Sequence, residues 1–126
     1  MAQQIATIHG RIAHDLFQVT LKVNKVKVHH IVVDTGAAAL IFNGEVARRL
    51  RLPNLGAVRV VGVGGTTAGF RSKCQLQVGT KIFRDVPCVV IKGFSKPGML
   101  GLKFFIDNHL SIYLDPIKQT LYVFRS

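Results

Sequence analysis

The strongest constraint on the fold is a pair of alternating segments joined by two polar residues. Apolar and polar residues alternate over 17–23, and the alternation resumes over 26–28 after Asn24 and Lys25. A period of two is typical of a strand with one buried face, and a two-residue polar break is typical of a tight turn. The sequence therefore predicts a β-hairpin whose second strand runs through the apolar residues 31–33.

That second strand ends at Asp34, which is followed by Thr35 and Gly36. The chain has only six acidic residues, so a carboxylate directly after an apolar strand is unusual, and we expect it to be buried. A buried charge is costly without partners, which favours a reactive site, although Asp-Thr-Gly is also an ordinary turn signal. Strand geometry predicts that one of His29 and His30 faces inward and the other outward.

The rest of the chain reads as further short strands with one or two short helices. Asn43 is a good N-cap for a helix over 45–50, which Pro53 prevents from continuing, and a second helix is expected over 99–107. The expected strands cover residues 5–12, 58–63, 71–78, 82–91, 111–114 and 120–124, with a short apolar segment at 40–42. This pattern predicts an all-β protein, a small closed barrel, formed by a single domain over residues 1–126.

Residues 62–69 contain four glycines. Such a segment suits a hairpin tip that can move and that lets its backbone approach a ligand. A phosphate-binding loop is excluded, because no Gly-Lys-Ser/Thr follows and no long helix is expected there.

The composition favours a globular protein with a strongly basic surface. Seventeen Lys and Arg against six Asp and Glu give a net charge of +11, spread along the chain without a run. This charge makes nucleic acid a possible partner, but interleaved surface aromatics are lacking. No stretch is long enough for a membrane span and no apolar leader opens the chain, so a soluble, cytoplasmic protein is expected.

The two cysteines, Cys74 and Cys88, are expected to be free thiols. A simple hairpin around Gly79 and Thr80 would place Cys74 opposite Asp85 and Cys88 opposite Arg71, about 10 Å out of register. A disulfide requires Cα atoms within about 7 Å. The spacing also matches no zinc site, so neither a metal nor a cofactor is expected.

Taken in order, these features resemble the retropepsin-like aspartic proteases. The strand into Asp34-Thr35-Gly36-Ala37 resembles the active-site loop of that family, and the glycine-rich hairpin lies where the family has its mobile flap. Leu100-Gly101, opening into an apolar helix, is similar to the family's C-terminal signature.

The resemblance implies an aspartic endopeptidase that is active as a homodimer. Two carboxylates sharing one proton activate a water molecule, and this chain has a single Asp-Thr-Gly, so each of two chains must supply one Asp34. An acidic-to-neutral pH optimum follows. The implied site comprises Asp34 as the catalytic residue, Thr35, Gly36 and Ala37 in the loop, Gly62, Val63, Gly64, Gly65 and Thr66 in the flap, and Leu100 and Gly101 in the packing behind.

Two features leave alternatives open. Ala38 stands where many relatives carry a polar residue, which bears on catalytic efficiency and peptide preference more than on the fold. Because a fold does not prove an activity, a catalytically weak or inactive peptide-binding or dimerisation module is the second interpretation. The apolar terminal segments 5–8 and 121–124 are candidates for pairing across the dimer, as in viral relatives.

Overall fold

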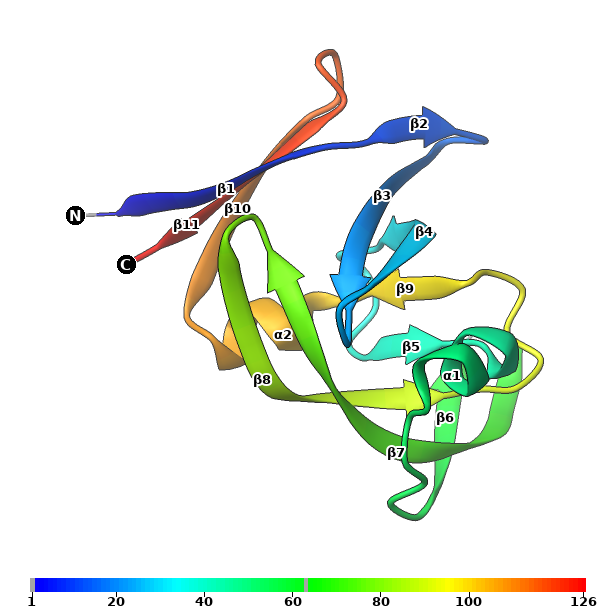
Figure 1. Cartoon of the computed structure of the whole chain (residues 1–126). Helices are drawn as coiled ribbons and strands as arrows, with labels where there is room; N and C mark the ends of the chain where they lie inside the picture. The colour runs from blue at the N-terminus through cyan, green and yellow to red at the C-terminus, as the bar shows by residue number, and fades with distance from the viewer. Residues whose placement is uncertain (1, 63) are drawn as a thin grey trace.

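The computed structural model describes residues 2–62 and 64–126, and within them strands predominate, which confirms the all-β prediction (Figure 1). The strands are β1 (Gln3–His9), β2 (Arg11–Ala13), β3 (Leu16–Val23), β4 (Val26–Val33), β5 (Leu40–Phe42), β6 (Ala57–Gly62), β7 (Gly65–Val78), β8 (Lys81–Val90), β9 (Gly98–Leu100), β10 (Leu110–Asp115) and β11 (Thr120–Arg125). The helices are α1 (Gly44–Leu50) and α2 (Leu102–Asp107). Neither is long and apolar enough to cross a membrane.

Eight strands form one strongly curled sheet in the order β2-β3-β4-β9-β5-β8-β7-β6. Strand β3 also pairs with β7, so the sheet returns on itself. That closing contact consists of only two residue pairs, Lys22 with Gln77 and Val23 with Leu76. The closed barrel expected from the sequence is thus a curled sheet with a short seam, and β2 and β6 lie outside the ring.

The two ends of the chain form a separate three-stranded sheet, in the order β1-β11-β10 (Figure 1). Strand β1 runs antiparallel to β11 from the pair Gln3 and Arg125 to the pair His9 and Thr120. The terminal segments therefore pair with each other within one chain, and the sheet edges left open are those of β1 and β10. The strand expected over 5–12 is also interrupted at Gly10, whose N–H donates to Gln119.

The hairpin of β3 and β4 forms as predicted, and its turn residues Asn24 and Lys25 both have positive φ angles, of 50° and 68°. Such a turn matches the twist of the flanking strands. The prediction for the histidines is wrong, because His29 and His30 are both exposed. They form a β-bulge opposite Thr20: Val19 pairs with Ile31 and Leu21 pairs with Val28, which leaves two residues of β4 facing one of β3.

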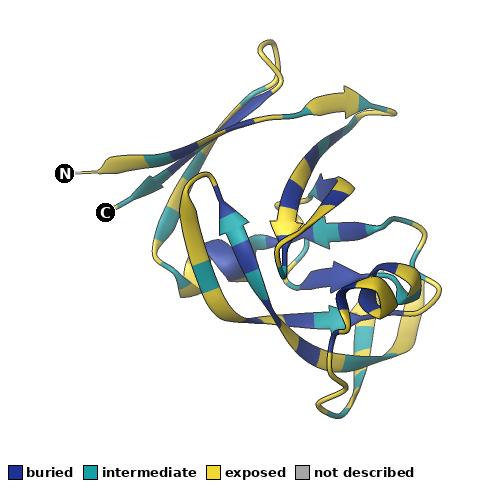
Figure 2. Ribbon diagram, in the orientation of Figure 1, coloured by how far each residue is buried: buried dark blue, intermediate teal, exposed yellow. Residues whose placement is uncertain are grey.

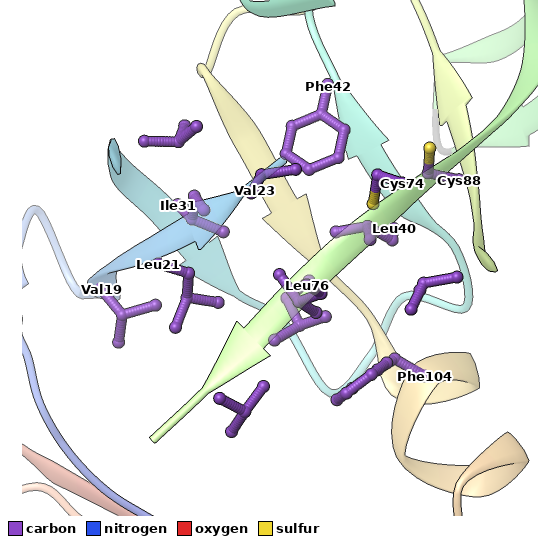
Figure 3. Close-up of a cluster of buried hydrophobic side chains, with 14 of the residues drawn as sticks. Val19, Leu21, Val23, Ile31, Leu40, Phe42, Cys74, Leu76, Cys88 and Phe104 are labelled. Carbon is purple, nitrogen blue, oxygen red and sulfur yellow. The ribbon is translucent and has the colours of Figure 1, made fainter. Parts of the chain in front are cut away.

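The core lies inside the curled sheet, where the inward-facing side chains of the strands are buried (Figure 2). Figure 3 shows part of it, in which aliphatic side chains from β3, β4 and β5 lie around Leu76 of β7, with Phe42 at one side and Phe104 of α2 at the other. Phe104 also packs edge-on against Phe83. A single core thus joins the sheet to α2, the helix that lies behind the segment after Asp34.

The register of β7 and β8 differs from the predicted one. Cys74 lies opposite Val86 and Cys88 opposite Ser72, because Asp85 takes part in a second bulge and has a φ angle of 53°. The thiols are free, as predicted, but are offset by two residues rather than three, and both are buried. Their mutual hydrogen bond, together with burial, raises the pKa of Cys74, and the same hydrogen bond lowers the pKa of Cys88.

Helix α1 begins where the sequence predicted, with the Asn43 side chain accepting a hydrogen bond from the Val46 N–H at 2.9 Å. The second helix is shorter than expected. Met99 and Leu100 belong to β9, which lies between β4 and β5, and α2 begins only at Leu102. The reason is that the apolar residues 98–100 complete the sheet before the chain turns into the helix.

Candidate functional site

Asp34 lies just beyond the end of β4, where the chain leaves the sheet. Its backbone N–H donates to the Leu100 carbonyl at 3.0 Å, and its own carbonyl accepts from the Ala37 N–H at 3.1 Å. The Gly36 N–H donates to the Asp34 Oδ1 atom at 2.8 Å, which orients the carboxylate. Contrary to the expectation of burial, Asp34 is exposed in the single chain.

The segment after Asp34 is held from behind by the start of α2. The N–H groups of Gly101, Leu102 and Lys103 donate to the carbonyls of Ala39, Ala37 and Ala38, at 3.2, 2.9 and 2.9 Å. These N–H groups have no partner inside the helix, because they lie at its first turn. The segment after Asp34 and the helix thus satisfy each other's backbone groups.

This attachment requires a very close approach at Gly101. A Cβ atom there would lie 2.5 Å from the Ala38 carbonyl oxygen and 2.7 Å from that of Ala37. Real Cβ contacts are not this short, so only glycine fits. Leu100, the neighbouring residue, is buried in the core and pairs with both Val33 and Leu40.

Asp34 lines a cleft that has a volume of about 1170 Å³. One wall is formed by the segment from Gly36 to Ala39, a second by the hairpin of β6 and β7, and a third by the connection between β8 and β9. Most of the lining is apolar, and Asp34 is the only acidic residue that lines the cleft in the part of the chain that the structure describes. An apolar cleft with a single convergent carboxylate is typical of a binding or catalytic site.

The glycine-rich hairpin extends from the base of the cleft. Gly62 pairs with Gly65 at its end, and Gly65 has a φ angle of 112°, a conformation that favours glycine. Added Cβ atoms at Gly62, Gly64 and Gly65 would meet no heavy atom within 4 Å, so this end of the hairpin stands clear of the rest of the chain. Of the predicted flap residues, Val63 lies outside the described residues.

The structure brings only some of the predicted residues to the cleft. Asp34, Gly36, Ala37 and Gly62 line it, whereas Leu100 and Gly101 lie behind the loop. Thr35, Gly64, Gly65 and Thr66 are exposed and lie outside its lining in the single chain.

The sequence reading missed one wall of the cleft, formed by Ile91, Lys92, Gly93, Phe94 and Ser95. The sequence feature that marks this wall is a cluster of Gly, Ser and Pro after a strand. Such a cluster predicts a loop but does not indicate that the loop contacts a site. Within the described residues, no three His, Cys, Asp or Glu side chains lie close enough together to hold a metal ion.

The comparison with models of protein families finds one family that matches the part of the chain that forms this cleft. Residues 19–107 match the model of the gag-polyprotein aspartyl proteases, a segment that spans β3 to α2 and so includes both Asp34 and the glycine-rich hairpin. The chain belongs to this family of retropepsin-like aspartic proteases. A comparison with curated protein sequences finds no match.

Solved structures of retropepsin-like proteins have the same fold. A retropepsin-like aspartic protease from Rickettsia conorii is similar with a TM-score of 0.68 at 21% identity, over 99% of this chain and 92% of that one. The retroviral protease-like domain of Ddi1 from Leishmania major has a TM-score of 0.64 at 21% identity, over 88% of this chain and 94% of that one. The EIAV protease, solved with an inhibitor, has a TM-score of 0.63 at 18% identity, over 77% and 91% of the two chains.

Proposed function

We propose that this chain is an aspartic endopeptidase that works as a homodimer, with Asp34 of each chain supplying half of the catalytic pair. One observation carries the proposal: the Asp34 carboxylate is exposed, oriented by the Gly36 N–H, and opens into an apolar cleft large enough for a peptide. Membership of the aspartic protease family supports the same reaction class.

In the proposed reaction, two Asp34 carboxylates lie about one hydrogen bond apart and hold one proton between them, since two like charges cannot both ionise at that distance. The ionised carboxylate takes a proton from a water molecule, which attacks the scissile carbonyl carbon. The protonated carboxyl polarises the carbonyl oxygen and gives it a proton as the tetrahedral intermediate forms. The carboxyl that took the proton from water then passes it to the nitrogen, the C–N bond breaks, the amine leaves, and the other carboxylate recovers its proton as the new carboxyl group forms. No covalent adduct with the protein forms.

The need for a second chain follows from the composition of the cleft. Asp34 is its only acidic residue among those described, so one chain offers one carboxylate where the chemistry needs two. Beside the end of the glycine-rich hairpin, Val61 is 81% exposed and so is available for contact with a substrate or a second chain. The open edges of β1 and β10 offer further surface for pairing.

The hairpin of β6 and β7 is the proposed flap. An added Cβ atom at Gly62, Gly64 or Gly65 would meet no heavy atom within 4 Å, so the end of the hairpin can move over a bound peptide without breaking packed contacts. An added Cβ atom at Gly69 would lie 2.5 Å from the Val90 carbonyl oxygen, so the hairpin is packed at that point. Closure of such a segment excludes water from the reaction and completes the site. In this proposal Thr35 holds the two active-site loops together across the dimer axis, and Gly36 lets the substrate backbone approach.

The first test compares the wild type with Asp34→Asn in the digestion of a diverse peptide mixture at several pH values. The amide cannot act as a base, so cleavage should fall by at least a thousandfold while the far-UV spectrum stays unchanged. Asp15→Asn is the matched control, because Asp15 lies in the exposed turn between β2 and β3 and does not line the cleft. Wild-type cleavage by the Asp34 variant would place the chemistry elsewhere.

The second test addresses the dimer. Because each chain carries half of the site, specific activity should fall on dilution in parallel with the dimer fraction measured by sedimentation. Specific activity that stays constant in a fully monomeric sample would contradict the shared pair. A wild type that binds a transition-state peptide inhibitor but cleaves nothing would instead favour the peptide-binding module.

A further inference from the structure

A second concave site lies where β1 crosses the sheet, away from the Asp34 cleft. It has a volume of about 380 Å³, and none of its lining residues lines the cleft. Residues Thr7, Ile8 and His9 at the end of β1 form one wall. Strand β1 lies close to the turn after β7 here, because a Cβ atom at Gly79 would lie only 2.7 Å from the Cβ atom of Ala6. Strands β3, β4 and β7 form the rest. We call this site the basic pocket.

The polar lining of the basic pocket consists largely of hydrogen-bond donors. Lys22 and Lys27 lie directly opposite each other on β3 and β4, and Gln77 of β7 lies opposite Lys22 on the other side. Across from this row, β1 contributes Thr7 and His9. The residues that line the hollow thus carry two ammonium groups, an imidazole, two hydroxyls and an amide, and the buried residues Ile8 and Leu21 complete the lining.

No carboxylate balances these charges. None of the six acidic residues of the chain, all of which lie in the described part, lines the basic pocket. The ion pairs that the described residues form are Lys73 with Asp85 and Lys103 with Asp107, and they involve neither Lys22 nor Lys27. Like charges directly opposite each other in a sheet are destabilising, so the free protein carries a repulsion that a bound anion would relieve.

We propose that the basic pocket binds a phosphate group. Lysine ammonium groups act as point charges toward phosphate. The Thr7 hydroxyl accepts from the Gln4 amide at 2.6 Å and keeps its own hydrogen for a remaining phosphate oxygen, whereas the Thr20 hydroxyl lies 3.0 Å from His29 Nδ1. The Nδ1 atom of His9 lies 3.3 Å from the Thr120 hydroxyl, which fixes the ring and leaves Nε2 as the remaining polar atom of the imidazole. This site does not depend on the peptidase activity proposed for the cleft.

The test measures the affinity of the full chain for inorganic phosphate at low ionic strength by titration calorimetry. Lys22→Gln with Lys27→Gln should weaken binding at least tenfold. The matched control is Lys96→Gln with Lys118→Gln, which removes the same charge from two lysines outside the pocket and should change affinity less than twofold. Equal weakening in both double variants, or no binding by the wild type, would overturn the proposal.

A stability measurement separates binding from a merely structural role. Without phosphate, the Lys22 and Lys27 double variant should be at least as stable as the wild type, because the opposed charges are gone. With phosphate, only the wild type and the control should gain stability, by linkage to the bound ligand. A double variant that is less stable without phosphate and gains as much with it would refute the site.

A second titration distinguishes a phosphate group carried on a polypeptide from free inorganic phosphate. A short phosphoserine peptide that binds more tightly than inorganic phosphate would support a site for phosphate carried on a polypeptide. A phosphopeptide that binds no more tightly would support a site for the small anion. Equal binding of the phosphorylated peptide and its unphosphorylated twin would show that the phosphate group is not recognised and would overturn the proposal.

Discussion

Replacing Gly101 with alanine tests how the Asp34 segment is held in place. The added methyl group would lie 2.5 and 2.6 Å from the carbonyl oxygen and carbon of Ala38, and 2.7 Å from the Ala37 oxygen. The backbone angles of Gly101, φ −91° and ψ −173°, suit alanine, so the effect is a steric one. All three contacts are with backbone atoms, which cannot rotate away as a flexible side chain can.

Overpacking of a buried site typically costs 1–3 kcal/mol, and the absence of a yielding neighbour places Gly101→Ala at about 2–3 kcal/mol of unfolding free energy. At 2 kcal/mol the ratio of folded to unfolded protein falls about 30-fold. Urea unfolding followed by circular dichroism measures this loss, and the peptide cleavage proposed for Asp34 should fall with it as the loop shifts. Gly62→Ala is the control: it meets no atom within 4 Å and should change stability by less than about 0.5 kcal/mol. A Gly101 variant as stable as this control would refute the close attachment of loop to helix.

Two further predictions address the rest of the chain. Asn43→Ala removes the side-chain acceptor for the Val46 N–H and should lower the free energy of unfolding by about 1 kcal/mol in urea, with Asn43→Ser retaining most of the stability. Cys74 and Cys88 are 4% and 3% exposed, and the raised pKa of Cys74 keeps its thiol protonated at neutral pH, so a thiol reagent should label neither in the folded protein and both in urea. Labelling of either thiol at the rate of a free thiol before unfolding would contradict this burial.

The sequence predicts most elements because local chemistry decides them. The turn at Asn24 and Lys25, the N-cap at Asn43 and the last hairpin all depend on residues close together in the chain. What the sequence does not predict depends on distant contacts. Met99 and Leu100 are predicted to begin a helix because their apolar run fits either structure, and only the insertion of β9 between β4 and β5 makes them extended. The cleft wall at residues 91–95 is not predicted for the same reason, since nothing in the local sequence indicates which site a loop approaches.

The two bulges show why a correct set of strands does not yet give a correct site. A one-residue shift moves every later side chain of a strand to the opposite face. In β4, simple alternation from Val28 would place His30 inward and Ile31 outward, whereas the extra residue lets Val28 and Ile31 both point into the core, with neither exposed. Every residue of β4 after the bulge is displaced by this one position, up to Val33, the residue before Asp34. The exposed pair His29 and His30, with its φ angle of 61° at His30, therefore sets which face each later residue of β4 presents up to the start of the Asp34 segment, although neither histidine lines the cleft.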